Sequence, residues 1–276
     1  MVDVINRDKV LLNNPLGKFF NDYEVLITSD TDVYKEDGSI LFKYRKKVVS
    51  EELQLLARET FLKHSKKINN QRGTASGGKT VNNNGFSFSS EKCRSSIVGY
   101  YDTVPPKLKK YFDKKTVCRQ TSFTKNNCDA WNKSLPFFER IGELYKELSP
   151  LHYSEQMEAI NKVNELFRIS NTPFTTVTTN YNFCTACHKD SGDFGLGNLT
   201  VVGDDYAGGY LIFPEYRIAV DVRPGDFIIM DVHEYHCNSL LESDDNHIRL
   251  SFVCYLREKM ISCTEKRIVN DEVYYV

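Results

Sequence analysis

The second half of the chain consists of short hydrophobic runs that are interrupted by turn-forming residues. From residue 173 onward, six runs are rich in β-branched and aromatic residues: FTTVTTNYNF, NLTVVG, GGYLIFP, RIAVDV, DFIIMDV and IRLSFVCYL. Gly, Asp, Asn and Pro stand between them, as is typical of strands that are bounded by turns. No helix-length segment separates the runs, so a parallel sheet with crossover helices is not expected. The pattern predicts a sandwich or jelly roll.

Helical patterns precede these runs. Ser50 is a candidate N-cap for residues 51–64, EELQLLARETFLKH, which have early acidic residues and apolar residues at helical spacing. Two further amphipathic helices are predicted, LPFFERIGELYKEL from Leu135 and SEQMEAINKVNELF from Ser154, with a Ser-Pro break between them. The predicted fold class is therefore α+β, a jelly-roll core with supporting helices mainly from the N-terminal half.

The predicted domain organisation is simple. Residues 1–48 are interpreted as an N-terminal extension, and residues 49–276 as a single catalytic domain. Within that domain, a helical and loop part (49–172) precedes the jelly-roll core (173–260). The polar stretch NNQRGTASGGKTVNNNGFSFSS in the first part is either a disordered loop or a functional one, because long loops in compact domains often carry function.

Composition and charge exclude few classes of protein. Of the 276 residues, 41% are hydrophobic and 26% are charged, as in an ordinary globular protein, and the formal net charge is −1. A neutral chain can still bind nucleic acid through a local basic patch. Three basic stretches, KYRKK from Lys43, KHSKK from Lys63 and KLKKYFDKK from Lys107, are either solvated faces or phosphate contacts.

The chain is expected to work inside the cell. Its first residues contain no apolar run that resembles a signal peptide, and no stretch is apolar enough to span a membrane. The eight cysteines are scattered through a chain too long to need disulfide bonds for stability, so most are expected to be reduced thiols, several of them buried. No obligate protein partner is evident.

The stretch CTACHKDSGD, from Cys184 to Asp193, allows three interpretations. Cys184, Cys187 and His188 spell the haem-attachment pattern C-x-x-C-H, but nothing here directs the export that haem c assembly normally requires. A zinc or dithiol site would need a second cysteine pair or a thioredoxin-like setting, and neither is present. His188 and Asp190 form H-x-D, and in an extended segment both side chains project to the same face. That arrangement is typical of the first two ligands of a non-haem iron.

A third ligand must come from a later strand. The segment PGDFIIMDVHEYHCN offers His233 and His236. His236 is the better candidate because it is placed at the end of the strand FIIMDV, whereas His233 is expected to be satisfied locally. The sequence therefore predicts an Fe(II) site that is formed by His188, Asp190 and His236, with open positions for a cosubstrate and dioxygen.

The strand RLSFVCYLR supplies a candidate cosubstrate site. Strand alternation separates it into two faces: Arg249, Ser251, Val253, Tyr255 and Arg257 on one, and Leu250, Phe252, Cys254 and Leu256 on the other. Arg249 offers two charge-assisted hydrogen bonds to a carboxylate, and Ser251 offers one more. The alternative is an amphipathic strand with Arg249 in water. We favour binding of 2-oxoglutarate, with its far carboxylate on Arg249.

With these residues in place, the chain resembles the TET/JBP family of Fe(II)- and 2-oxoglutarate-dependent nucleobase oxygenases, particularly its compact members. The resemblance extends from Gln71 to Arg257. It includes, in the family's order, QRGTASGG, RSSIVGYYD, CRQTSFT, ELSPLHYSEQ, TPFTTVTTNYN, HKDSGD, YAGGYLIFPEY, GDFIIMDVHEYH and RLSFVCYLRE.

The resemblance implies a double-stranded β-helix that holds iron through His188, Asp190 and His236. It implies that Arg249 and Ser251, helped by Arg94, bind 2-oxoglutarate. It also implies that the target base is flipped into the site, at a cost of a few kcal/mol. The residues expected to contact that base are Asp193, Tyr255 and Arg257, with Val253 near the methyl group. Arg257 stands where some members have a histidine, and the cysteine-rich zinc module of larger relatives is missing.

The resulting hypothesis is a dioxygenase that oxidises the 5-methyl group of a pyrimidine in DNA. The expected substrate is 5-methylcytosine, oxidised to 5-hydroxymethylcytosine and further, with thymine as the second candidate base. A 2-oxoglutarate oxygenase that hydroxylates a protein side chain or a small molecule is the alternative enzyme, because the triad and the jelly roll do not define the substrate. A binding protein with a vestigial jelly roll is the non-enzymatic alternative.

Overall fold

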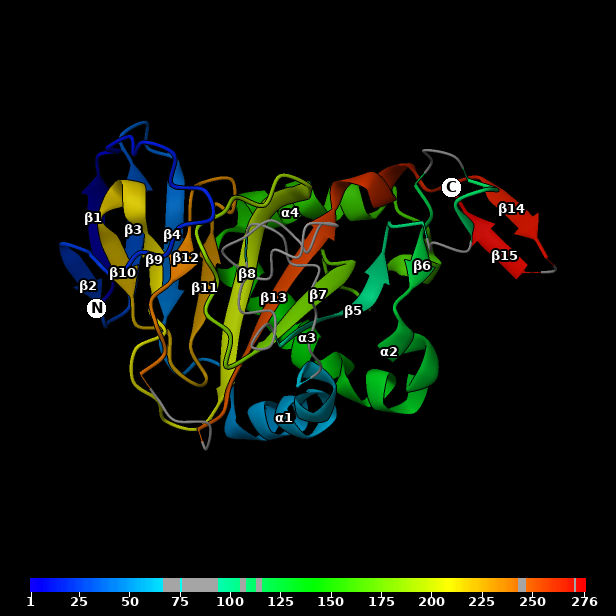
Figure 1. Ribbon diagram of the computed structural model, residues 1–276, viewed down its shortest axis with the longest axis horizontal. Helices are drawn as coiled ribbons and strands as arrows, with labels where there is room; N and C mark the ends of the chain where they lie inside the picture. Colours follow the sequence, from blue (N-terminus) through cyan, green and yellow to red (C-terminus); the bar gives the residue numbers. More distant parts are fainter. Residues whose placement is uncertain (67–74, 76–93, 105–107, 113–115, 243–246, 271) are drawn as a thin grey trace, which may run out of the picture. The chain divides into compact units, whose positions relative to one another are not determined.

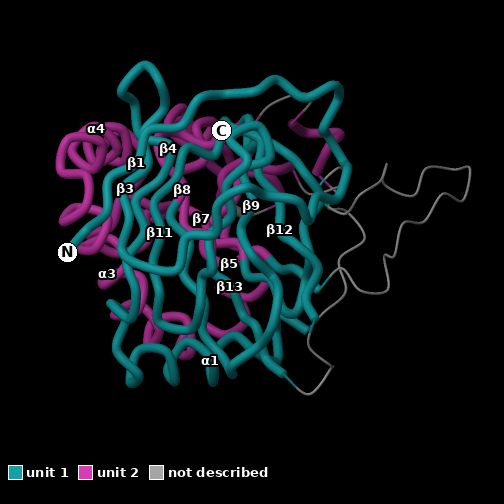
Figure 2. The backbone as a smooth tube through the Cα atoms, turned by 90° about the vertical axis from the view of Figure 1, so that its left-hand side faces the viewer, with its two compact units in different colours: residues 1–96, 179–191, 198–252 teal, residues 97–178, 192–197, 253–276 magenta. Residues whose placement is uncertain are grey.

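The computed structural model describes all residues except 67–74, 76–93, 105–107, 113–115, 243–246 and 271. The polar stretch NNQRGTASGGKTVNNNGFSFSS therefore lies outside the described residues, apart from its Ala75. The chain forms two compact units (Figure 2). Unit 1 contains residues 1–96, 179–191 and 198–252, and unit 2 contains residues 97–178, 192–197 and 253–276.

Two sheets form the predicted jelly roll (Figure 1). The nine-stranded sheet has the order β1 (Asp3–Arg7), β3 (Thr31–Lys35), β4 (Ile40–Arg45), β11 (Phe227–Met230), β8 (Asp193–Gly203), β13 (Arg249–Arg257), β7 (Thr176–Tyr181), β5 (Ser95–Tyr101) and β6 (Arg119–Gln120). The four-stranded sheet has the order β12 (Cys237–Asn238), β9 (Leu211–Phe213), β10 (Ile218–Val220) and β2 (Val25–Ile27). A hairpin of β14 (Lys266–Val269) and β15 (Glu272–Tyr275) follows near the C-terminus.

Each of the six hydrophobic runs contains a strand, so the predicted core is confirmed. In strand β13, the burial of the side chains follows the predicted alternation between two faces. Its apolar face, Leu250, Phe252, Cys254 and Leu256, has no exposed surface at all. Phe252 packs edge-to-face on Phe61 of the first helix, with ring centroids 5.5 Å apart. This packing places the other face of β13, with Arg249 and Ser251, on the side where a site can form.

Residues before 49 contribute four strands that were not predicted. β4 pairs antiparallel with β11, and β2 pairs parallel with β10. The two sheets meet within unit 1 where Phe42 of β4 stacks on Phe213 of β9, with ring centroids 5.3 Å apart and both rings fully buried. The four strands are short, and β1 and β3 contain charged residues, so they have no long hydrophobic run from which they could have been predicted. The division of the chain at residue 49 stays a prediction.

The helices confirm the predicted positions with shifted ends. In α1 (Glu51–Ser65), the Ser50 side chain accepts a hydrogen bond from the Leu53 amide, as expected of an N-cap. The second predicted helix begins earlier: α3 spans Cys128–Leu148 and contains Pro136. It follows α2 (Ser122–Asn126). The third, α4 (Pro150–Ile160), begins at the proline that was read as a break, because Pro is tolerated in the first helical turn.

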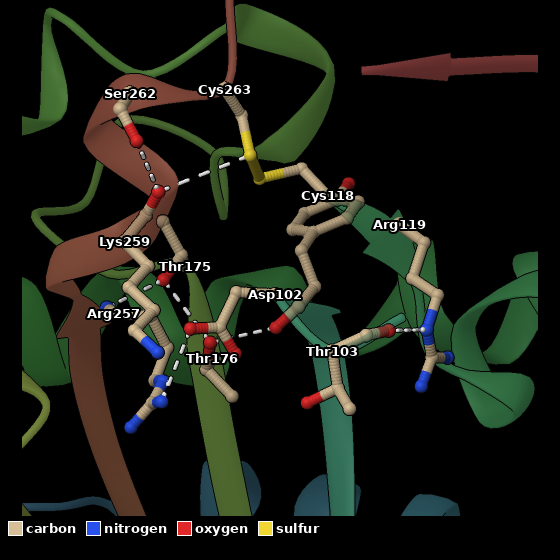
Figure 3. The surroundings of a disulfide bond; sticks show 11 residues. Asp102, Thr103, Cys118, Arg119, Thr175, Thr176, Arg257, Lys259, Ser262 and Cys263 are labelled. Atoms are coloured by element: carbon tan, nitrogen blue, oxygen red, sulfur yellow. Dashed lines mark hydrogen bonds and ion pairs between the residues drawn. A yellow bond between two sulfur atoms is a disulfide. The ribbon is translucent and has the colours of Figure 1, made fainter. Parts of the chain in front are cut away.

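The cysteines depart from the expectation in one pair. Cys118 and Cys263 form a disulfide within unit 2 (Figure 3). The other described cysteines are thiols, and three of them, Cys187, Cys237 and Cys254, are buried, as predicted. None of the helices in the described part of the chain combines the length and the apolar character that a membrane crossing requires.

Candidate metal and cosubstrate site

His188 and His236 face each other across an isolated antiparallel bridge in unit 1. Each backbone amide donates to the other residue's carbonyl at 3.0 Å, and the two imidazole rings lie 4.4 Å apart between centroids. His236 stands immediately before β12, not at the end of β11 as predicted, because the chain turns through residues 231–235 after that strand. This turn places His236 beside the segment that contains His188 and Asp190.

Asp190 completes the set. Its backbone amide donates to the Val232 carbonyl at 2.9 Å, which keeps the segment extended and puts its side chain on the same face as His188. One carboxylate oxygen lies 3.7 Å from Nε2 of His188, and the other lies 3.8 Å from Nε2 of His236. Two atoms that bind one ion at about 2.1 Å can be at most about 4.2 Å apart, so these distances suit a shared metal.

The imidazole tautomers favour metal binding. Nδ1 of His188 lies 2.7 Å from the Ala186 carbonyl, and Nδ1 of His236 lies 2.9 Å from the Glu234 carbonyl. A carbonyl oxygen can only accept, so each Nδ1 carries the proton and each Nε2 carries the lone pair. Both lone pairs are therefore presented beside the carboxylate of Asp190, which is the arrangement that a metal-ligating histidine requires. Among the described residues, these three form the one group whose donors converge in this way.

The competing interpretations of the C-x-x-C-H pattern do not fit the structure. Cys187 is fully buried against Ile212, Ala219 and Cys237, so its sulfur has no access to a haem vinyl group. The Cys184 thiol donates to the Asn238 carbonyl instead, at 3.1 Å between the sulfur and the oxygen. Burial raises the pKa of Cys184 to about 11, so this thiol resists ionisation.

His233 behaves as the locally satisfied histidine that was expected. Its Nδ1 lies 3.1 Å from a carboxylate oxygen of Asp231, and the same oxygen accepts a hydrogen bond from the His233 backbone amide. Half of its side chain is exposed, and it does not belong to the converging group.

Arg249 has the environment of an anion-binding residue. It is 2% exposed, and its Nε has no hydrogen-bond partner among the described residues. No described carboxylate lies at ion-pair distance; its guanidinium packs on the Tyr206 ring, 5.6 Å from the centroid. At Gly209, with φ +68°, a Cβ would lie 3.3 Å from that Nε, so glycine leaves space beside the charge. A buried guanidinium without a carboxylate is costly unless a ligand neutralises it, and the far carboxylate of 2-oxoglutarate fits.

Ser251 is buried two residues along the same face of β13. The Asn180 side-chain amide lies 3.5 Å from its hydroxyl, and the Asn180 carbonyl oxygen is buried without a partner among the described residues. Asn180 was not predicted from the sequence, but its polar side chain adds to the cosubstrate candidates. Arg94 lies with its guanidinium 5.4 Å from the centre of the Tyr181 ring. Its assistance to 2-oxoglutarate stays a prediction.

The N-terminal segment contacts the metal-binding loops directly. The Gly17 amide donates to the Cys187 carbonyl at 2.7 Å, and the Cys187 amide donates to the Lys18 carbonyl at 2.8 Å, so the residue before His188 is held on both sides. Lys9 forms an ion pair with Glu234, whose carbonyl orients His236. These contacts could not be predicted, because a single lysine in an irregular segment has no pattern.

Unit 2 contains a second polar cluster, centred on Arg257 (Figure 3). One guanidinium nitrogen lies 3.1 Å from a carboxylate oxygen of Asp193, and another lies 3.1 Å from one of Asp102. Burial opposes the charge, but the two carboxylates raise the pKa of Arg257. A Cβ at Gly192 would lie 2.7 Å from the first nitrogen, so this glycine allows the close approach. The sequence identified Asp193 and Arg257 but missed Asp102, the last residue of RSSIVGYYD.

The two remaining predicted substrate residues also lie in unit 2. The Tyr255 hydroxyl lies 3.0 Å from that of Thr178, and the tyrosine is buried. Val253 is partly buried on the same strand. Their contacts with a base stay a prediction.

Comparison with known proteins agrees with this chemistry. Residues 96–258 match the family described as Tet_JBP, the oxygenase domain of the 2OGFeDO superfamily. The bifunctional helicase and thymine dioxygenase JBP2 of Leishmania braziliensis is 35% identical over 173 residues, which cover 61% of this chain and 15% of the relative. Thymine dioxygenase JBP1 of Trypanosoma brucei brucei is 35% identical over 170 residues, which cover 59% of this chain and 19% of the relative. The chain thus spans less than a fifth of the length of either relative.

A solved structure shares the fold. NgTET1 in complex with 5mC DNA superposes with a TM-score of 0.60 at 16% sequence identity, covering 95% of this chain and 84% of that one. At this identity the similarity supports the double-stranded β-helix.

Proposed function

Because the chain belongs to the Tet_JBP family, the oxygenase domain of the 2OGFeDO superfamily, we propose that it oxidises the 5-methyl group of a pyrimidine base in DNA. It is an Fe(II)- and 2-oxoglutarate-dependent dioxygenase. Bound iron, with 2-oxoglutarate and dioxygen, supplies an oxidant able to hydroxylate a methyl group, with release of succinate and CO2. DNA is the substrate in this proposal, and the protein would therefore act inside the cell.

The observation that carries the proposal is the combination, within unit 1, of three converging metal ligands and a buried arginine, Arg249, that has no carboxylate at ion-pair distance among the described residues. His188, Asp190 and His236 would hold the metal from one side. Arg249 would bind the far carboxylate of 2-oxoglutarate, which fixes the orientation of the cosubstrate. The relatives named as thymine dioxygenases support a DNA pyrimidine over a protein side chain.

The base would be read by Asp193 and Arg257. Thymine presents an N–H between two carbonyl oxygens, and 5-methylcytosine presents an amino group beside two acceptors. Either base therefore needs one acceptor, which a carboxylate provides, and one donor, which a guanidinium provides. The Nε of Arg257 is buried and has no partner among the described residues, so a donor is available. This pairing suits pyrimidines as a class.

Product analysis in DNA tests the proposal. Three duplexes of one sequence would be incubated with Fe(II) and 2-oxoglutarate, then digested for mass spectrometry of nucleosides. One contains 5-methylcytosine, one contains thymine but no methylcytosine, and one has uracil in place of thymine and no methylcytosine. We expect 5-hydroxymethylcytosine from the first or 5-hydroxymethyluracil from the first two, and no hydroxylated base from the third.

Two variants make the assay specific. Asp190→Ala removes a metal ligand and should abolish product formation. Asp37→Asn removes a carboxylate from the exposed turn between β3 and β4 and should leave product formation unchanged. Unmodified bases in all three duplexes, with succinate formed when peptide is supplied, would contradict a DNA substrate.

A further inference from the structure

Unit 2 contains a cavity of about 980 Å³ that the proposed chemistry does not use. Its walls come from β6, α2, the short helix Glu165–Phe167 and the C-terminal hairpin of β14 and β15. The volume is at the upper end of the range for small-ligand sites. No residue assigned above to iron, 2-oxoglutarate or the target base lines it.

The charged residues that line the cavity are all basic. Arg119, Lys125 and Lys266 line it, and no acidic residue does so among those described. Arg119 donates from Nε to the Thr103 carbonyl at 2.8 Å, and no described carboxylate lies at ion-pair distance. Burial lowers the pKa of Arg119, and the neighbouring Tyr101 and Asp102 oppose this shift only in part, so holding the charge here costs free energy. An anion in the cavity would offset that cost.

The remaining walls are aromatic, aliphatic and polar, with Leu108, Leu166 and Val273 as the aliphatic part. Phe167, Tyr274 and Tyr275 line the cavity. Phe167 and Tyr275 pack edge-to-face with centroids 5.4 Å apart, and Tyr274 packs in the same way on Phe112 at 5.4 Å. The rings are therefore held by neighbours and present fixed surfaces. Basic side chains beside aromatic rings are the combination that binds nucleic acid strands, with phosphates on the cations and bases on the rings.

The cavity adjoins the Arg257 cluster within unit 2. Arg119 is hydrogen-bonded to Thr103, the residue after Asp102, and Asp102 is paired with Arg257. The disulfide connects the same two regions, because Cys118 lines the cavity and Cys263 follows the helical turn after Arg257 (Figure 3). A strand of DNA that places one base at Arg257 therefore has its neighbouring nucleotides close to the cavity.

We propose that this cavity binds a nucleotide that flanks the target base, with its phosphate on Arg119 and Lys125 and its base against Tyr274. The identification of the ligand as DNA rests on the proposed function. The cavity would add affinity that does not depend on the methyl group, and it would hold the strand while the target base is out of the stack.

Salt-dependent binding tests the phosphate contact. A fluorescein-labelled duplex would be titrated with iron-free protein at several NaCl concentrations, and binding would be followed by fluorescence anisotropy. Arg119→Met should weaken binding about tenfold and reduce the slope of log K against log [NaCl] by about 0.9, the value for one lost phosphate contact. Lys162→Met is the matched control, because Lys162 is an exposed cation of unit 2 outside the cavity wall, and it should change neither quantity.

Base stacking is tested separately. A duplex with 2-aminopurine next to the target position should lose fluorescence on binding to the native protein and retain it with Tyr274→Leu. Thermal melting of each variant identifies a folding defect. If Arg119→Met melts at a lower temperature than the native protein, Lys125→Met replaces it in the salt-dependence assay, since Lys125 is exposed and its loss should leave the fold intact.

The outcomes distinguish the two proposals. Native affinity and slope in both Arg119→Met and Lys125→Met would overturn the cavity proposal, even if DNA methyl groups were oxidised. DNA binding that depends on Arg119, without any oxidised base, would support the cavity and contradict the proposed function. Displacement of DNA by polyglutamate at equal concentration of anionic groups would also overturn the cavity proposal, because the cavity would then bind any polyanion.

Discussion

At the scale of single residues, Arg249 allows cosubstrate binding to be separated from folding. The guanidinium is buried and has no described carboxylate partner. Arg249→Met keeps most of the side-chain volume and removes an uncompensated charge, so the protein without ligand should melt at the native temperature or above it. The dissociation constant for 2-oxoglutarate should rise about 100-fold, measured by the visible band that forms with Fe(II) under anaerobic conditions.

The control for this prediction is Arg58→Met. Arg58 pairs with Asp204 at a partly exposed position, 2.8 Å between the charged groups, and its loss should leave the 2-oxoglutarate affinity unchanged. Native affinity in Arg249→Met, or unfolding of that variant in the absence of ligand, would show that Arg249 has a structural role instead.

Cys184 gives a pH-dependent prediction. Burial raises the pKa of its thiol to about 11, so the thiol stays protonated near pH 8 and should react slowly with iodoacetamide. Because the folded-state pKa lies above the ordinary value, alkylation of the folded protein should accelerate only as the pH approaches 11. Cys128 is exposed and serves as the reference thiol in peptide mass spectrometry. Equal labelling of the two cysteines at pH 8 would contradict the protected position of Cys184, whose side chain is partly buried.

Local spacing explains which site residues could be predicted. His188 and Asp190 lie two positions apart on an extended segment, so their common face follows from the strand period alone. Asp102 pairs with Arg257 across 155 positions of the chain. Nothing in the local sequence of either residue indicates that the end of β5 and the end of β13 are brought together.

At the scale of structural elements, the N-terminal segment should support metal binding. Glu234 is 12% exposed and is surrounded by Lys9, Lys35 and Lys189, at 2.5, 3.8 and 3.9 Å, and its carbonyl orients His236. Lys9→Met or Glu234→Gln should weaken binding of Co(II), used as a spectroscopic probe, by about tenfold. The visible spectrum of the Co(II) complex should also change, which a purely structural role would not require.

Arg7→Met is the matched control for Lys9→Met. Arg7 lies in the same segment, pairs with the exposed Glu24 and donates to the Tyr216 carbonyl, and it forms no ion pair with Glu234. Lys9→Arg should restore Co(II) affinity, because a cation returns to Glu234. If Arg7→Met and Lys9→Met weakened Co(II) binding equally, the effect would belong to the fold of the segment and not to the ion pair.

Hydrophobic periodicity explains which elements could be predicted. The strands after residue 173 have strongly hydrophobic runs, whereas β1 and β3 contain charged residues and have no comparable run. The start of α3 was placed too late because Pro136 resembles a helix start, although the helix already begins at Cys128. Tertiary packing determines where α3 begins, since Trp131 and Ser134 in its first turns are buried.

At the scale of the whole molecule, the Cys118–Cys263 disulfide should stabilise unit 2. It closes a segment of 145 residues, for which the chain-entropy account gives about 5 kcal/mol as an upper value. The double variant C118S/C263S should therefore unfold at a lower urea concentration, and a reducing agent should lower the midpoint of the native protein but not that of the variant. Identical midpoints for the oxidised native protein and the double variant would contradict this prediction.

The two units contain different parts of the proposed chemistry. Unit 1 holds the metal-ligand set and Arg249, and unit 2 holds the Arg257 cluster and the basic cavity. The family match begins at residue 96, so β1–β4, which complete the sheets of unit 1, lie outside it. The jelly roll could be predicted from its central strands, but the strands that extend its sheets could not.

The central claim is that oxidation of a DNA methyl group consumes 2-oxoglutarate. The most direct test counts succinate and oxidised base in the same reaction, with duplexes that differ only in the 5-methyl groups of their pyrimidines. We predict one succinate for each oxidation step found on the methylated duplex, which is one for each hydroxymethyl base, and background succinate on the methyl-free duplex. Equal succinate from both duplexes, without an oxidised base, would contradict the account.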